Sequence, residues 1–203
     1  MLKRFSWKKN DVHSIQLKEN LYTIAQLLDI PYVAFFNISS ENNNFNEKSL
    51  DLNNLKPFGV CMVLNDFFKK CSEGKVKNVQ PNLNIPIPEI FISSDRGQWG
   101  SRSEISDDKL IYNLVKIDPI VGDKGIMGNE IIQYNIDRND SNIINNYEII
   151  GYNTGYELVR RLILSIENSR WIDPLKELRL LGVDNYPLKT VEEMWHYGVP
   201  KYE

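Results

Sequence analysis

The side chains in this 203-residue chain that commonly do chemistry are two histidines, two cysteines and some adjacent carboxylates. A catalytic nucleophile needs a base within hydrogen-bond reach, often within a motif such as GxSxG, and a catalytic zinc site often shows as HExxH. Neither His13 nor His196 lies in such a motif, and Cys61 and Cys71 lie ten positions apart without metal-binding spacing. We therefore expect structural histidines, two free thiols, no catalytic residue, no metal and no cofactor.

Adjacent carboxylates occur at Asp107-Asp108 and at Glu192-Glu193. Neighbouring residues point in different directions on a helix or a strand, whereas acid/base catalysis needs carboxylates that converge from separate elements. We interpret the first pair as part of a loop and the second as the favourable negative charge in the first turn of a helix. An enzyme of unrecognised class stays an alternative, with no residues to assign to it.

Acidic residues are concentrated in one part of the chain. Between Glu104 and Glu157 there are ten acids and four bases, a local formal charge of −6 in a chain whose total is −3. Such a region repels nucleic acid and attracts a basic protein. Ordinary solvated loops are the alternative interpretation. If a partner binds, the predicted contact residues are Trp99, Asp107, Asp108, Asp137 and Asp140.

Basic residues accompany aromatic ones near the N-terminus, which suggests a second class of function. Nucleic-acid-binding modules combine cationic and aromatic side chains on one surface. The overall acidity favours a solvated charged face instead, so direct nucleic-acid binding is not expected. The two basic stretches are Lys3, Arg4, Lys8 and Lys9 with Phe5 and Trp7, and then Lys69, Lys70, Lys75 and Lys77.

Three short strands are predicted near the N-terminus, where side chains of different polarity alternate. Residues 12–17 and 21–26 show the two-residue period of half-buried strands, and the polar residues 18–20 between them suit a turn. Pro31 interrupts the next ladder, and the β-rich run 32–36 restarts it. The sequence thus predicts a three-stranded antiparallel meander.

The residues of this meander resemble the opening of the Immunity protein 26 family of bacterial polymorphic toxin systems. The matching residues, all within 7–37, are Trp7, Asp11, Ile15 to Leu17, Tyr22, Ala25-Gln26-Leu27-Leu28 and Ala34-Phe35-Phe36. The chain departs from the family pattern at Asn10 in place of Gly, at Thr23 after the Tyr, and at Asn37 in place of an acid. The resemblance implies a protein that neutralises a cognate toxin C-terminal domain and is not a catalyst. The acidic stretch makes a nuclease the expected toxin, because proteins that cleave nucleic acid are commonly basic.

Further strands are predicted at 90–93, 110–117 and 131–136, and the apolar run 58–68 is either a strand or the start of a helix. Helix signals then dominate the end of the chain. Thr154 and Glu157 form a capping-box pattern before an apolar stripe that ends near residue 168. A second helix is predicted from Asp173-Pro174 to Gly182, and a third, with a second capping-box pattern at Thr190 and Glu193, from Thr190 to Gly198.

Together these elements predict an α+β fold in one domain, residues 1–203. A curved, mainly antiparallel sheet or small barrel over residues 7–150 is expected to precede C-terminal helices, over 154–200, that pack on it. No apolar run approaches the roughly 20 residues of a membrane span, and no export signal is visible. We therefore expect a soluble, cytoplasmic protein. From the resemblance we expect it to cover the active or target-binding surface of a toxin.

Overall fold

The structure is a computed structural model that describes residues 4–47, 49–94, 110–118, 121–122, 124, 128–187 and 190–201. The chain divides into two compact units, each assembled from segments that are separate in sequence. Unit 1 comprises residues 1–87, 152–172 and 188–203, and unit 2 comprises residues 88–151 and 173–187. That the whole chain acts as one domain stays a prediction.

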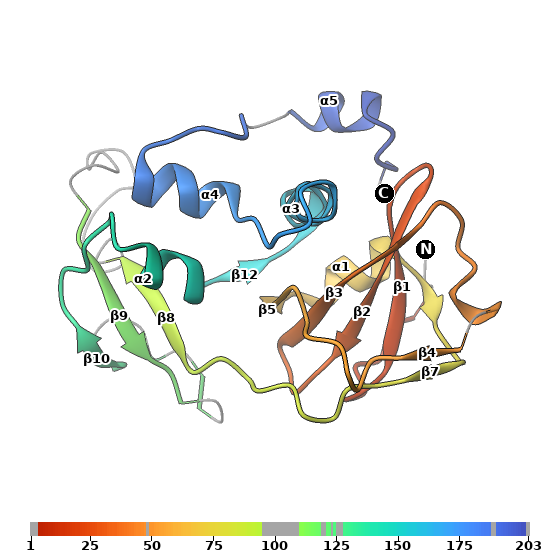
Figure 1. The fold of residues 1–203 in the computed structure, drawn as a ribbon, viewed down its shortest axis with the longest axis horizontal. Coiled ribbons are helices and arrows are strands. Elements are labelled where there is room, and N and C mark those ends of the chain that lie inside the picture. The colour runs from red at the N-terminus through yellow and green to blue at the C-terminus, as the bar shows by residue number, and fades with distance from the viewer. Residues whose placement is uncertain are drawn as a thin grey trace. The chain divides into compact units, whose positions relative to one another are not determined.

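Unit 1 is built on a curled six-stranded sheet, which confirms the predicted α+β class (Figure 1). The predicted meander forms from β1 (Val12–Lys18), β2 (Leu21–Leu27) and β3 (Tyr32–Ser40), because β1 pairs with β2 and β2 with β3, both antiparallel. At one edge β12 lies parallel to β5. In spatial order the strands are β12 (Tyr152–Asn153), β5 (Gly59–Val63), β3 (Tyr32–Ser40), β2 (Leu21–Leu27), β1 (Val12–Lys18) and β6 (Ser72–Lys75).

Side-chain alternation directs one face of this sheet into the larger core. Helix α3 (Gly155–Glu167) packs on that face through Leu158, Val159, Leu162 and Ile163, as its apolar stripe predicted. Strands β1, β2, β3 and β5 each contribute alternate residues, as a two-residue period requires. The strand residues that share this core include Ile15, Leu17, Ala25, Leu27, Val33, Phe35, Cys61 and Val63.

The capping box predicted at the start of α3 is wrong, although the helix begins where expected. Thr154 is the N-cap residue, but its side chain accepts no capping hydrogen bond. Gly155 adopts a φ of 55°, so the residue after the cap is left-handed. A capping box needs helical backbone after the N-cap, which would bring the Thr hydroxyl and the Glu157 carboxylate to the free N–H groups.

The ambiguous apolar run resolves into both kinds of element. Residues 59–63 form β5, and α1 (Asn65–Cys71) begins two residues later. Helix α1 buries Phe67, Phe68 and Cys71. A continuous apolar run fits a strand buried on both faces as well as a buried helix, so its period alone does not separate the two.

The opposite face of the meander is covered by short segments of the chain that lie between β3 and β8 (Ile90–Ser94) in sequence. Short elements there are η1 (Phe45–Glu47), β4 (Leu50–Asp51) and β7 (Val79–Gln80), with β4 parallel to β7. Gln26 is fully buried, and its amide donates to the carbonyl of Asn82 at 2.7 Å and accepts from the N–H of Asn82 at 2.9 Å. Both faces of the meander therefore contribute to the interior.

Helix α5 (Val191–His196) completes unit 1. Its predicted capping box is confirmed, because Thr190 Oγ1 accepts from Glu193 N at 3.2 Å and Glu193 Oε2 accepts from Thr190 N at 2.6 Å. Met194 and Val199 join the same core as α3. Within the described ranges, no helix combines the length and apolarity that crossing a membrane requires.

Unit 2 is built on a four-stranded sheet in the order β10-β9-β8-β11. The strands are β8 (Ile90–Ser94), β9 (Tyr112–Lys116), β10 (Glu130–Gln133) and β11 (Glu148–Ile149). The predicted strands are confirmed, but β10 ends earlier than expected, because Asn135 has a left-handed φ of 47°. Helix α2 (Ser141–Asn146) covers the core residues Ile92, Tyr112 and Leu114 with Ile143 and Ile144.

The predicted second C-terminal helix belongs to unit 2 rather than to the first sheet. Helix α4 (Pro174–Lys176) continues as the π-helical turn η4 (Glu177–Leu181), whose Leu180 enters the unit 2 core. Asp173 caps it by accepting from Lys176 N at 3.0 Å, and Gly182 ends it with a φ of 65°. Both end signals were visible in the sequence, but the surface that the helix covers was not.

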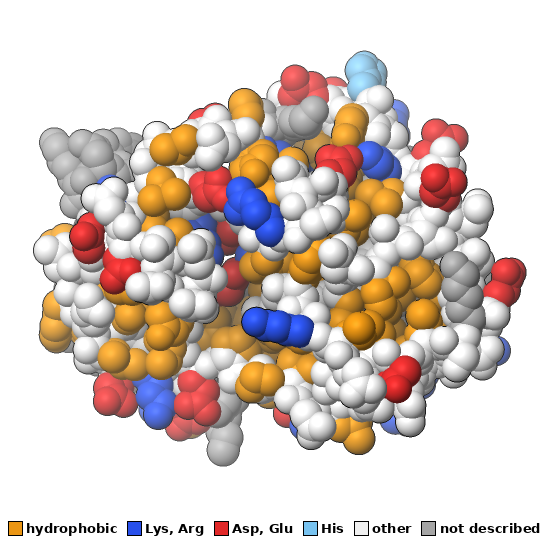
Figure 2. All heavy atoms as spheres, in the orientation of Figure 1, with side chains coloured by type: hydrophobic (Ala, Val, Ile, Leu, Met, Phe, Trp, Pro, Cys, Tyr) orange, Lys and Arg blue, Asp and Glu red, His pale blue; other side chains and the backbone are white. Residues whose placement is uncertain are grey.

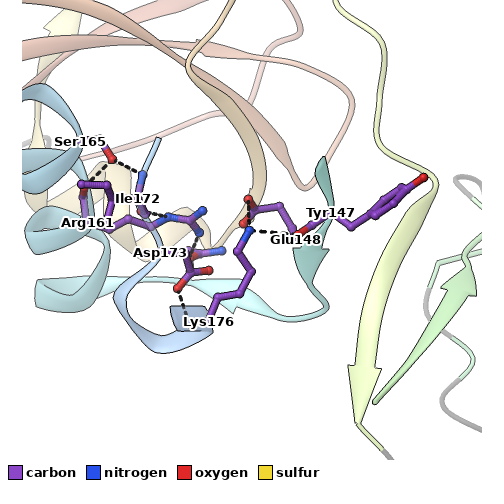
Figure 3. A network of polar contacts seen from close by, with 8 residues as sticks. Tyr147, Glu148, Arg161, Ser165, Ile172, Asp173 and Lys176 are labelled. Carbon is purple, nitrogen blue, oxygen red and sulfur yellow. Dashed lines mark hydrogen bonds and ion pairs between the residues drawn. The ribbon is translucent and has the colours of Figure 1, made fainter. Parts of the chain in front are cut away.

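Two polar anchors hold the segments on either side of residue 172 (Figure 3). In unit 1, Arg161 Nε donates to Ile172 O at 2.9 Å, and Ser165 Oγ accepts from Ile172 N at 3.0 Å. In unit 2, the buried Lys176 Nζ donates to Tyr147 O at 3.1 Å and lies 3.9 Å from Glu148 Oε1. A buried ammonium requires partners of this kind, because its desolvation is costly.

The indole of Trp171 packs in unit 1 against Gly59, which has no side chain to block it. Its ring stacks on Phe35 with 6.1 Å between centroids, and the guanidinium carbon of Arg161 lies 4.2 Å from the ring centroid. A Cβ atom at Gly59 would lie 2.2 Å from Trp171 Cε2. Gly59 is therefore the residue of β5 that allows the indole to reach Phe35.

We expect Gly59→Ala to lower the free energy of unfolding by about 1–3 kcal/mol, because overpacking forces the indole or the strand to move. Urea denaturation measures the loss. The matched control is the same substitution in a Trp171→Leu background, where a smaller side chain leaves room for the methyl group and the added cost should be smaller. An equal cost in both backgrounds would show that the indole does not impose the glycine.

Candidate functional site

The acidity predicted from the sequence is a property of unit 2. With the unit boundaries applied to the full sequence, unit 2 holds fourteen acids and eight bases, a formal charge of −6. Unit 1 holds thirteen acids and sixteen bases, a formal charge of +3. A field of one sign concentrated in one unit is the arrangement that steers an oppositely charged macromolecule.

The structure brings together two of the predicted contact residues. Asp137 is exposed and Asp140 is half-buried in the turn between β10 and α2, where Asp140 N donates to Asp137 O at 3.1 Å. Asp137 Oδ1 accepts from Asn139 N at 2.8 Å, and Asp140 Oδ1 accepts from Asn142 N at 2.9 Å, which caps α2. Trp99, Asp107 and Asp108 lie outside the described residues.

An arginine fixes this acidic turn against β9. The guanidinium of Arg138 donates to Leu110 O, and its carbon lies 5.2 Å from the ring centroid of Tyr112. The flanking carboxylates are thus attached to the sheet by a side chain between them. Because an ionised carboxylate has about four acceptor sites, the local hydrogen bonds leave each of these acids able to meet a cation.

A charged hollow of about 440 Å³ lies at the opposite end of the β9–β10 pair. Lys116 lines it, with Nζ 3.6 Å from Glu89 Oε2, and Glu130 is paired opposite Lys116 in the ladder. Asp118 holds the following turn by accepting from Val121 N at 3.2 Å. The described lining is Glu89, Lys116, Asp118, Lys124, Gly128, Asn129 and Glu130.

The chemistry of this hollow is that of ion pairing. Its described lining offers three carboxylates and two ammonium groups, which suit the charged side chains of a partner. No histidine, cysteine or hydroxyl side chain is among these described lining residues. Across the described parts of the chain, no three His, Cys, Asp or Glu side chains are grouped so as to hold a metal ion.

Between these two charged regions lie β10 and the residue that follows it, Tyr134, with two exposed apolar side chains. Ile132 is 48% exposed and Tyr134 is 72% exposed. A bulge between Ile131 and Gln133 leaves Ile132 outside the regular pairing with β9. Figure 2 shows hydrophobic side chains over the strands of unit 2, with acidic side chains above and below them. We call residues 130–134 the β10 surface.

Sequence reasoning missed Ile132 and Tyr134 as contact candidates. The run 131–136 was interpreted only as a strand, and its side chains were assigned to neither solvent nor core. Exposure here depends on β10 being at the edge of its sheet and on the bulge, and both depend on which strand pairs with it. An aromatic residue beside the acidic Asp137 was the one available signal.

His13 and Ser72 form a pair of catalytic type in unit 1, but it is closed to substrate. His13 Nδ1 lies 3.0 Å from Ser72 Oγ, and Ser72 is fully buried. The rings of Phe5 and Phe68 flank the imidazole at centroid distances of 5.5 and 5.7 Å. The nearby carboxylate of Asp11 pairs with Lys75 at 2.6 Å. This geometry supports the prediction of a structural histidine.

The two basic stretches of unit 1 meet in space, but their aromatic residues face inward. Phe5 stacks on Phe68 at 4.9 Å, and Trp7 Nε1 donates to Leu28 O at 2.8 Å. Phe5 and Trp7 are half-buried and pack against the unit 1 core. Three of the lysines form ion pairs with carboxylates, namely Lys9 with Asp29, Lys70 with Asp66 and Lys75 with Asp11.

The comparison with protein families gives a match over residues 2–183, which includes the whole of the β10 surface and the charged hollow. The chain belongs to the family described as Domain of unknown function (DUF8309). No curated protein and no solved structure matches the chain. The part of this DUF8309 chain that the family match leaves out contains α5, which completes the unit 1 core.

We expect the buried His13 to make stability depend on pH. Burial lowers the pKa of His13 from its ordinary value of 6.5, while Asp11 raises it by less and Lys75 lowers it. The unfolded chain therefore takes up a proton that the folded chain resists, so the contribution is present above about pH 6.5 and is lost as the pH falls towards the folded pKa. The free energy of unfolding, measured by urea denaturation, should fall between about pH 7 and pH 5.

In His13→Gln this fall should be smaller, because no imidazole becomes protonated on unfolding at that position. The control is His196→Gln, since the side chain of His196 is exposed. It should keep the wild-type dependence. An unchanged slope in His13→Gln would contradict the assignment.

Proposed function

We propose that this protein is an immunity protein that binds a cognate toxin C-terminal domain and neutralises it by covering its active or target-binding surface. The observation that carries the proposal is the formal charge of −6 of unit 2, in which Ile132 and Tyr134 also expose apolar side chains. The resemblance of residues 7–37 to the Immunity protein 26 family supports the same function. Those residues belong to the unit 1 scaffold.

The expected toxin is a nuclease, and its chemistry complements that of unit 2. A protein that cleaves nucleic acid carries lysine and arginine where it contacts phosphates. The same cations would meet Glu130 at the start of β10 and Asp137 in the turn after it, while Ile132 and Tyr134 supply apolar contact between them. Charges at the rim speed association, and buried aromatic anchors provide most of the affinity.

The mechanism is steric. The protein occupies the toxin surface that nucleic acid would occupy, so inhibition makes and breaks no covalent bond. The cytoplasm of the producing or neighbouring bacterium is the compartment where such an inhibitor acts.

Co-expression with the toxin domain encoded beside this protein tests the proposal. The expected result is rescued growth and a purified 1:1 complex whose association slows as salt is added, because added ions screen the charges that guide encounter. Loss of growth despite co-expression, with no complex formed, would refute the function. Retention of the protein on oligonucleotides at low salt would instead favour the nucleic-acid-binding alternative.

Charge reversal tests the site within this function. We expect Glu130→Lys combined with Asp137→Lys to weaken toxin binding by roughly tenfold or more, because like charges then face the basic toxin. Surface plasmon resonance measures the change. The matched control is Glu19→Lys combined with Glu41→Lys, which changes the net charge equally at exposed acids of unit 1. Equal effects of the two pairs would contradict a binding site on unit 2.

A further inference from the structure

We propose that the outer edge of β10 binds an extended, basic segment of the partner as an additional strand of the unit 2 sheet. This inference deepens the proposed function and rests on it, because it specifies how the acidic unit holds a toxin. The observation behind it is a sheet edge with the exposed apolar side chains of Ile132 in β10 and Tyr134 just after it, the carboxylate of Glu130 at its start and that of Asp137 in the following turn.

The edge is open in the part of the chain that the structure describes. In the order β10-β9-β8-β11, β10 pairs with β9 on one side, and no described strand pairs with its other side. The outer row of an edge strand presents N–H and C=O groups that another chain can pair with. Strand addition at such an edge draws its affinity from main-chain hydrogen bonds and its specificity from side chains.

The side chains of β10 offer anchors for an incoming strand. Tyr134 presents most of its ring to solvent, and the bulge leaves Ile132 outside the regular ladder. Aromatic side chains provide large contact areas at low entropy cost, so they dominate many interfaces. An added strand would cover both residues and remove their apolar surface from water.

The charges select a basic occupant. Glu130 begins β10 in a hollow whose described lining holds the carboxylates of Glu89, Asp118 and Glu130 and the ammonium groups of Lys116 and Lys124, and Asp137 follows Tyr134 after two residues. The strand has four residues, and the chain turns at the left-handed Asn135 before it reaches Asp137, so the incoming segment pairs over about four residues. Cationic side chains towards the two ends of that segment would meet Glu130 at one end and the turn with Asp137 beyond the other.

The same charges oppose other occupants. A second copy of this chain would bring another unit of −6 against the edge, and nucleic acid would bring phosphates. Like charges across an interface cost affinity, and this cost is a common way to exclude wrong partners. The bulge and the four-residue length of β10 further limit pairing between identical edges.

Amide shifts in the ¹⁵N-labelled full-length protein test the inference without any toxin. The probes are two eight-residue peptides, one alternating lysine with valine and the other alternating glutamate with valine. We expect the lysine peptide alone to shift the amide signals of residues 130–134, and added salt to weaken the shifts. Tyr134→Ala should weaken peptide binding by roughly fivefold, while Val183→Ala, at an exposed apolar residue elsewhere in unit 2, should leave it unchanged.

The inference is overturned if the lysine peptide shifts no amide of β10, if both peptides shift them equally, or if Tyr134→Ala has no effect. These results are separable from the toxin test. Growth rescue without peptide binding at β10 would refute strand addition and leave the immunity function standing. Peptide binding at β10 with no protection from the toxin would refute the immunity function and keep the strand-binding edge.

Discussion

Burial of both faces of the β1–β3 meander is the constraint on which the rest of unit 1 depends. One face packs against α3 and α5, and the other is covered by the chain that carries β4 and β7. Gln26 shows how strict this is, because a fully buried amide has to be satisfied by the backbone of Asn82. A sheet enclosed in this way has little strand surface left for binding, so unit 1 is better suited to be a scaffold.

Unit 2 distributes its residues differently. Helix α2 and η4 cover its sheet through one apolar core. On the β10 surface Ile132 and Tyr134 are exposed to solvent, and the carboxylates of Glu89, Asp118 and Glu130 line the adjacent hollow. Two cations of unit 2 have defined partners. Lys176 is buried beside Glu148 and the carbonyl of Tyr147, and the guanidinium of Arg138 contacts the ring of Tyr112 and so holds the acidic turn on the sheet. Buried cations of this kind stabilise the unit only while their partners are present. The exposed acids are therefore the ones available to a partner.

Much of the fold was predictable, because its signals are local. The meander, the apolar stripe of α3 and the capping box at Thr190 depend on residues within a few positions of one another. The errors arose where a distant contact or a backbone angle decided the result. The left-handed Gly155 prevented the capping box at Thr154, and the left-handed Asn135 ended β10 early. Leu180 packs in the unit 2 core, so the helical segment that begins with α4 belongs to unit 2. For the site, the acidity and the turn with Asp137 and Asp140 were predictable, but the exposure of Tyr134 was not.

The sequence by itself determined the α+β class, the meander, three strands of unit 2, the C-terminal helices and the acidic stretch, since periodicity, caps and charge depend on neighbouring residues. Helix α2 and the short strands β4, β6, β11 and β12 were not predicted. Only the tertiary structure decided that the acids and β10 belong to one compact unit while the basic stretches belong to the other. It also decided which strand stands at an edge and which histidine is sealed beside a serine. The physical reason is that pairing order and burial come from contacts between residues far apart along the chain, which no local pattern encodes.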